Sequence, residues 1–247
     1  MSEPAASPSE LVWLLAVTTA LFCLVFIAWA YQGRFVEVVE LNRAPWKPVS
    51  YAFAIWGVIY LTTAVSAAAQ SLFYLYNVDR FNDANALALH ALSLGIACVW
   101  PPLASHPEYR YRVLSAVVLT LAAVLALVAT SVDALLARHT VVWITVTHPP
   151  AALLAGWLLV AASLSLHGLV ASGSLDEPSE LPIGSAVPAM LSIVTSFVAI
   201  ATVDLFLVVP VVWALCCQKR QTVWSVVGLL VSGVSLVVVV SFEIAEA

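Results

Sequence analysis

Long apolar runs follow one another along nearly the whole chain, separated by short polar stretches. Five runs are clear at about residues 11–30, 51–76, 86–104, 113–136 and 141–171, and another lies at about 222–242. A helix needs roughly 20 apolar residues to cross about 30 Å of hydrocarbon. The runs therefore predict an all-α, multi-pass integral membrane protein whose first partner is the lipid bilayer.

Composition agrees with this class. Charged residues make up 9% of the 247 residues, against about 25% in an average soluble domain. The net charge of −5 comes mostly from the acidic ends and the loop at 176–180, so we expect no nucleic-acid partner.

Met1–Pro4 lacks Lys and Arg, which predicts that the first span is retained rather than cleaved. We find no nucleophile arrangement, phosphate loop or metal motif, so we expect no enzyme activity and no metal site.

The apolar run at 187–217 is too long for one upright crossing. A straight helix of these 31 residues would be about 46 Å long. One interpretation is a tilted helix kinked near Pro210, in which Asp204 would be a buried ion or proton site. The other is a tight hairpin whose second arm is capped by Asp204.

The distribution of Lys and Arg favours the hairpin, because short cytoplasmic loops are enriched in basic residues. With the N-terminus outside, the hairpin puts seven basic residues inside and two outside, whereas one long helix gives five against four. The seven are Arg34, Arg43, Lys47, Arg110, Arg112, Lys219 and Arg220, and the two are Arg80 and Arg138. We therefore expect eight spans, with seven as the alternative.

Aromatic residues are unusually dense in the second span. Phe53, Trp56 and Tyr60 follow the i, i+3, i+7 spacing that places side chains on one helical face. Flat aromatic faces suit a flat hydrophobic ligand, although packing between helices uses the same residues. Gly57 and Gly156 each lie beside a Trp, and we expect both at close helix contacts.

The segment 48–61, preceded by Arg43–Pro48, resembles the signature of the TspO/translocator protein family, the tryptophan-rich sensory proteins of the long TspO/MBR-like type. Three further segments resemble the family in the same order: Cys98–Leu103 around Trp100, Pro150–Trp157, and Asp204 followed by Val212–Leu215. The resemblance covers about residues 40–215.

This resemblance implies a five-helix bundle at 11–171, after an acidic tail at 1–10, with a ligand pocket under a lid loop at 31–50. An acidic loop at 172–186 and additional helices in 187–247 would follow. Family members bind porphyrins and sterol-like molecules, so the chain would be a receptor or translocator for a flat hydrophobic ligand. The implied pocket residues are Trp46, Phe53, Trp56, Tyr60, Trp100 and Trp157, with Ser165 where the family carries Asn. We expect Trp56 and Trp157 to line one shared cavity.

Three ionisable residues in apolar spans are further candidates, namely His90, His148 and Asp204. Such residues are costly in a membrane and often functional. A neutral imidazole could ligate haem, which makes a non-covalently bound tetrapyrrole the one cofactor under consideration, or it could be a hydrogen-bonded core residue. Two other function classes stay open: a structural subunit of a homo-oligomer or larger membrane complex, and a secondary transporter coupled through Asp204 or a histidine.

Overall fold

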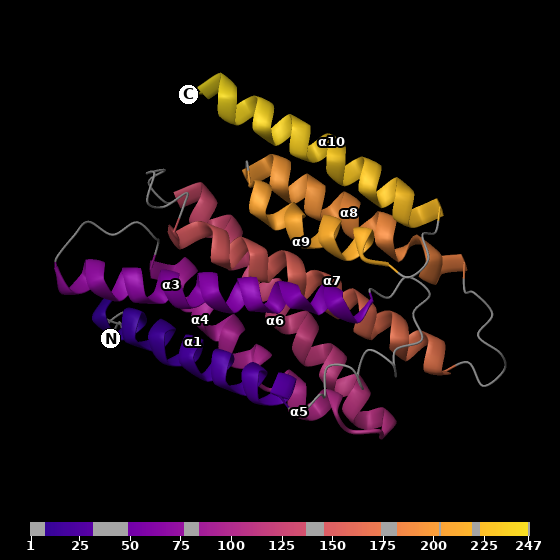
Figure 1. Cartoon of the computed structure of the whole chain (residues 1–247), viewed down its shortest axis with the longest axis horizontal. Helices are drawn as coiled ribbons and strands as arrows, with labels where there is room; N and C mark the ends of the chain where they lie inside the picture. Colours follow the sequence, from indigo (N-terminus) through magenta and orange to yellow (C-terminus); the bar gives the residue numbers. More distant parts are fainter. Residues whose placement is uncertain are drawn as a thin grey trace, which may run out of the picture.

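The computed structural model describes residues 8–31, 49–76, 84–136, 146–173, 182–202, 204–218 and 223–246. The elements in these ranges are helices (Figure 1). In chain order they are α1 (Pro8–Tyr31), the 3-10 helix η1 (Ser50–Ala54), α3 (Ile55–Leu75), α4 (Ala84–Ala97), α5 (Trp100–Ala104), α6 (Tyr109–Leu136), α7 (His148–Gly173), α8 (Pro182–Thr202), α9 (Leu205–Cys216) and α10 (Val223–Glu246).

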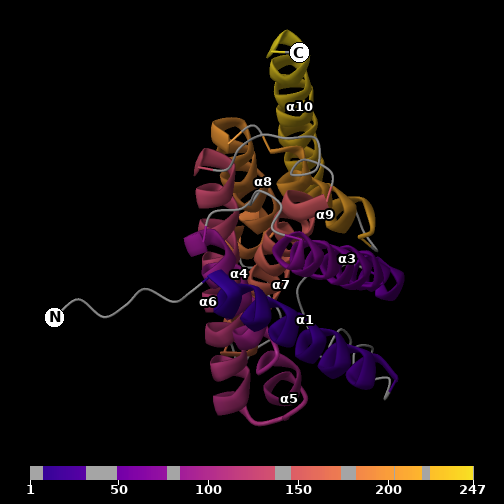
Figure 2. The same cartoon turned by 90° about the vertical axis from the view of Figure 1, so that its left-hand side faces the viewer.

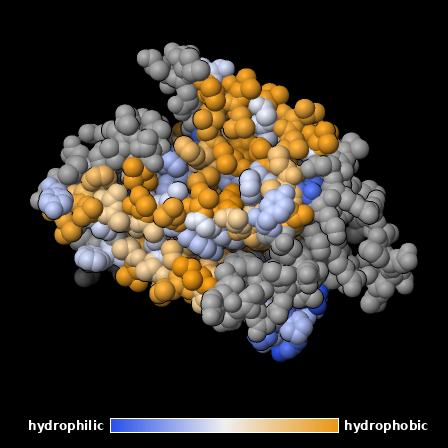
Figure 3. All heavy atoms as spheres, viewed as in Figure 1, coloured by the Kyte–Doolittle hydropathy of each residue, from blue (hydrophilic) through white to orange (hydrophobic). Residues whose placement is uncertain are grey.

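Four described segments are long and apolar enough to cross a membrane. They are Tyr51–Phe73, Asn85–Ala104, Tyr109–Leu135 and His148–Leu169. Large apolar side chains point outward from several helices, among them Leu61, Val117, Phe197 and Leu230, and hydrophobic residues cover much of the face that α3 and α10 present in Figure 3. Apolar surface of this extent is unfavourable in water and suits lipid. The predicted all-α class is confirmed for the described residues, and four of their helical segments are long and apolar enough to cross a membrane.

Successive long helices run in alternating directions, so the bundle has two distinct ends (Figure 1). The N-terminal end holds the starts of α1, α4, α7 and α9. The other end, which we call the Arg110 end, holds the starts of α3, α6 and α10. There the Val49 amide donates to the Cys217 carbonyl at 2.8 Å, which ties the end of α9 to the start of η1. Helix α10 packs on α8 and α9 at one edge, away from α1 (Figure 2).

Helix α7 lies at the centre, in contact with α3, α6, α8 and α9. Pro149 and Pro150 fall in its first turn, where a missing N–H removes no helical hydrogen bond. A Cβ added at Gly156 would overlap the Leu207 carbonyl oxygen and lie 3.1 Å from Pro210 Cγ. The absence of a side chain at Gly156 therefore lets α9 lie directly on α7, as predicted.

The matching prediction for Gly57 is wrong. Gly57 is exposed, and a Cβ built there meets no atom within 4 Å. The neighbouring Trp56 points inward, and on a helix the next residue is rotated by about 100°. Gly57 therefore faces away from the helices that Trp56 contacts.

The hairpin prediction for 187–217 is confirmed, because the run divides into α8 and α9 at Asp204. The Asp204 backbone is extended, and its Oδ1 accepts from the Phe206 amide at 2.9 Å, as expected of an N-cap. The 12 residues of α9 span about 18 Å, which is shorter than the hydrocarbon layer. Lys219 and Arg220 lie outside the described residues, so their membrane side stays a prediction.

The third predicted span is not one continuous helix. Helix α4 ends at Ala97 and α5 begins at Trp100, with Cys98 and Val99 between them. Pro101 and Pro102 follow directly. Proline has no N–H to donate to the preceding turn, and its ring clashes with the carbonyl four residues earlier. The two prolines therefore end α4 and fit the first turn of α5.

Candidate functional site

Seven aromatic side chains from five elements pack together towards the Arg110 end of the bundle. We call Phe22, Phe26, Phe53, Trp56, Tyr60, Trp100 and Trp157 the aromatic cluster. The Trp56 ring is at its centre. Its centroid lies 4.8 Å from that of Phe26, 5.7 Å from that of Tyr60 and 6.0 Å from that of Trp157. The Tyr60 ring is stacked on Trp56, and the Trp157 ring meets Trp56 edge-on.

The remaining members extend this cluster on two sides. Phe53 meets Trp157 edge-on with a centroid separation of 5.7 Å, and Trp100 is stacked on Phe26 at 6.1 Å. Separations of 4.5–7 Å with offset or edge-to-face geometry are those that aromatic pairs prefer. The elements are thus joined by ring contacts rather than by aliphatic packing alone.

Five of the predicted pocket residues are in this cluster: Phe53, Trp56, Tyr60, Trp100 and Trp157. The prediction that Phe53, Trp56 and Tyr60 share one face is confirmed, because all three rings are in the cluster. The nearby Tyr51 is 63% exposed and is not part of that face. Trp46 lies outside the described residues, as does most of the lid loop, so the cavity beneath that loop stays a prediction. Ser165 is half-buried, about two turns beyond Trp157 on α7, and is not one of the cluster residues.

Phe22 and Phe26 were not predicted. Both are fully buried on α1, and their ring centroids are 4.7 Å apart. The first span is apolar on all sides, so its pattern does not show which face points inward. Their i, i+4 spacing was the available signal, because it places two rings on one helical face.

Two polar atoms in the cluster lack a hydrogen-bond partner in the described part of the chain. They are Nε1 of Trp157, whose side chain is 1% exposed, and the buried hydroxyl oxygen of Tyr60. A buried polar group left unsatisfied costs roughly 1–3 kcal/mol. Such groups are rare in native proteins and call for a bound water, ion or ligand as partner. The aromatic cluster therefore contains two buried donors that the described residues leave unsatisfied.

No protein-family model, curated protein or solved structure matches the chain. The similarity to the TspO/translocator family is therefore a resemblance of sequence motifs. The last of the four motif segments lies against the start of the second span. Trp213 Nε1 donates to the Ala52 carbonyl at 2.8 Å, so the Val212–Leu215 segment packs against the start of the aromatic second span.

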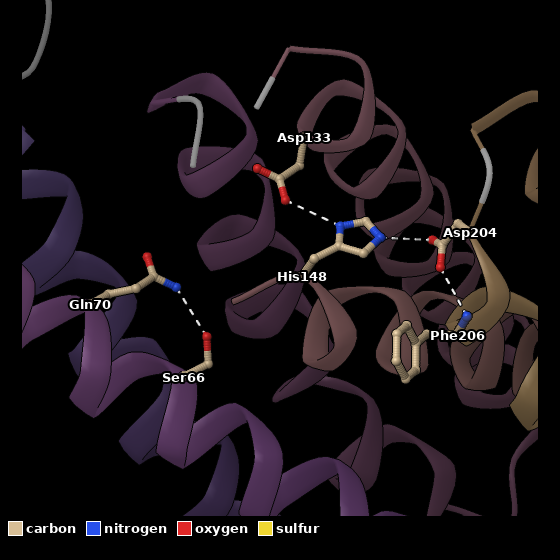
Figure 4. Close-up of polar contacts among 6 residues, drawn as sticks. All are labelled: Ser66, Gln70, Asp133, His148, Asp204 and Phe206. Carbon is tan, nitrogen blue, oxygen red and sulfur yellow. Dashed lines mark hydrogen bonds and ion pairs between the residues drawn. The ribbon is translucent and has the colours of Figure 1, made fainter. Parts of the chain in front are cut away.

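A second group of predicted residues meets at the N-terminal end of the bundle. The imidazole of His148, at the start of α7, lies between two carboxylates (Figure 4). Its Nδ1 is 3.2 Å from Oδ2 of Asp133 near the end of α6, and its Nε2 is 3.0 Å from Oδ2 of Asp204. All three side chains are at most 4% exposed. We call this group the Asp–His–Asp triad.

Asp204 has both of the roles that the sequence presented as alternatives, the helix N-cap and the buried carboxylate. Asp204 caps α9 through Oδ1, and it is also a buried carboxylate that faces His148 through Oδ2. Asp133 was not predicted. The sequence did contain a signal for Asp133, because an acidic residue inside an apolar span is itself a functional candidate.

A small polar cavity adjoins the triad on the α3 and α4 side. Its volume is about 20 Å³, enough for roughly one water molecule. The polar side chains that line it are Thr63, Ser66, Gln70, His90, Asp133 and Thr147. His90 is 8% exposed, and its Nδ1 has no hydrogen-bond partner in the described part of the chain. His90 and Asp133 thus line one polar cavity, which connects the third predicted candidate to the triad.

This geometry leaves little room for the predicted haem ligation by His148, because both ring nitrogens already face carboxylates. An iron would have to displace Asp133 or Asp204. Among the described residues, no group of three or more His, Cys, Asp or Glu side chains is arranged to hold a metal ion. His90 keeps a free Nδ1, but it lies beside the polar cavity rather than in the aromatic cluster.

Proposed function

We propose that this protein is a multi-pass membrane receptor or translocator that binds a flat hydrophobic ligand, of tetrapyrrole or sterol-like type, at the aromatic cluster. The observation that carries the proposal is the convergence of Trp56, Tyr60, Trp100 and Trp157 with two unpartnered buried donors. A planar ligand needs broad ring faces for stacking and a few fixed polar groups for orientation. The cluster brings aromatic rings and two buried donors together in one region.

The position of the cluster supports the same function. Helix α1 ends at Tyr31, shortly after Phe26, and η1 begins just before Phe53. The two described residues that flank segment 32–48, Tyr31 and Val49, are therefore close in sequence to members of the cluster. Together with the motif resemblance, this favours a site between the cluster and that segment. A five-helix translocator-type bundle, extended by α8, α9 and α10, is part of the proposal.

A porphyrin titration tests this function. We expect the purified protein to shift the Soret band of added protoporphyrin, and Trp157→Leu to weaken binding about fivefold. That factor corresponds to the loss of roughly 1 kcal/mol of aromatic contact. Trp13→Leu is the matched control, because Trp13 is 63% exposed on α1 and should leave the affinity within twofold of the wild type.

Equal affinities for wild type, Trp157→Leu and Trp13→Leu, with all three proteins folded, would contradict the proposed site. The same titration with a sterol separates the two ligand types. If neither ligand binds, the aromatic cluster is a packing core. That result would favour a structural subunit over a receptor.

A further inference from the structure

We propose that Asp133, His148 and Asp204 form a proton-binding site inside the membrane bundle. This inference is independent of the ligand proposed for the aromatic cluster, because the two sites lie towards opposite ends of the bundle. It depends on the positions of the two imidazole nitrogens relative to the carboxylate oxygens, which Figure 4 shows.

The number of protons in the triad is limited by the chemistry of its imidazole and carboxylate groups. A neutral histidine carries one N–H, so one ring nitrogen donates and the other can only accept. An ionised carboxylate can also only accept. In the triad, both nitrogens lie within 3.2 Å of a carboxylate oxygen. With neutral His148 and two ionised carboxylates, one of the two contacts would therefore bring two acceptors together.

One additional proton removes this conflict. If it binds to His148, the imidazolium donates to Asp133 and to Asp204. If it binds to a carboxylate, the resulting acid donates to the bare ring nitrogen while the other nitrogen donates to the second carboxylate. In both cases the proton comes from water and neutralises one buried negative charge. The two distances, 3.2 Å to Asp133 and 3.0 Å to Asp204, fit a triad with the proton bound.

The surroundings suit a proton rather than a larger cation. The titratable groups described around the site are Asp133 from α6, His148 from α7, Asp204 before α9 and His90 from α4, whereas α3 contributes the uncharged Thr63, Ser66 and Gln70. The carboxylates lie on opposite sides of the imidazole (Figure 4), so they do not converge on one point where a metal ion could bind. The cavity beside Asp133 has room for about one water, and a water there could deliver a proton.

Basic side chains in the described part of the chain are distant from the triad. They are Arg110 and Arg112, at the start of α6. Arg112 is 21 positions before Asp133, or roughly 30 Å along the helix. Buried carboxylates in a membrane are costly unless they are neutralised or paired. A proton bound in the triad would neutralise one of its two carboxylates.

Vibrational and magnetic resonance spectra of the full chain in lipid nanodiscs test the proposal at pH 8, where an unperturbed imidazole is almost fully neutral. We expect one of two signatures. Either the ¹⁵N spectrum shows one doubly protonated histidine, which His148→Gln removes, or the infrared spectrum of ¹³C-aspartate protein shows a protonated carboxyl band. Asp204→Asn should abolish either signature, because the amide group can donate to the bare ring nitrogen. His106→Gln, which removes an exposed histidine, should change neither.

A wild-type spectrum with only neutral histidines and no protonated aspartate at pH 8 would overturn the proposal. This measurement does not depend on the variants, since the isotope labels identify histidine and aspartate in the wild type. A doubly protonated histidine that persists in His148→Gln would place the proton elsewhere and would also overturn it.

Discussion

Replacing Asp204 with alanine is expected to destabilise the protein by about 3–5 kcal/mol. Removing one partner of a buried ion pair costs this much because the other partner stays buried without compensation. The change also removes the N-cap of α9, worth about 1 kcal/mol by itself. Asp204→Asn keeps an oxygen for the Phe206 amide and a polar contact to His148, so its loss should be smaller. Thermal unfolding in detergent ranks the stabilities of the wild type and the two variants.

The control for this prediction is a surface ion pair. Glu108 and Arg110 lie 2.7 Å apart and are 55% and 73% exposed. Exposed pairs contribute roughly 0–1 kcal/mol, so Glu108→Ala should scarcely change the unfolding temperature. If Asp204→Ala is no less stable than Glu108→Ala, the Asp–His–Asp triad does not hold α9 against α6 and α7.

The second large effect is expected at Gly156. Gly156→Leu should lower stability by roughly 1–3 kcal/mol or more, because overpacking forces neighbouring groups to move. Here the first obstacle is the backbone oxygen of Leu207, which cannot rotate away as a side chain can. Gly57→Leu is the matched control, since that position is open, and its effect should stay within about 0.5 kcal/mol.

Thermal unfolding of the two glycine variants in the same detergent gives the comparison. Equal stability of Gly156→Leu and wild type would mean that α7 and α9 are not packed as closely as described. A large loss for Gly57→Leu would place that glycine at a helix contact after all.

The helices were predictable because membrane spans follow from local composition. The limits of α3 and α6 agree with the predicted runs to within a few residues, and the capping chemistry of Asp204 was readable from its position in an apolar run. Gly57 shows where this reasoning stops. A glycine beside a tryptophan is a local pattern, but whether another helix lies over it depends on packing that the pattern does not contain.

The sites were only partly predictable for the same reason. Trp56, Tyr60, Trp100 and Trp157 were identified from motifs, and the structure brings them together, but Phe22 and Phe26 lie in a span without a distinct face. His148 and Asp204 were separate candidates, 56 positions apart in the chain. Their meeting with Asp133 depends on how α6, α7 and α9 pack, which no spacing in the sequence encodes.

Tryptophan fluorescence during a porphyrin titration in nanodiscs tests whether a flat hydrophobic ligand stacks on the aromatic cluster, as we claim. We expect quenching that saturates at one porphyrin per chain, with a smaller quenched fraction in Trp157→Leu and an unchanged saturation point in Trp13→Leu. Quenching that rises without saturation, to the same extent in all three proteins, would show porphyrin dissolved in lipid and would contradict the claim.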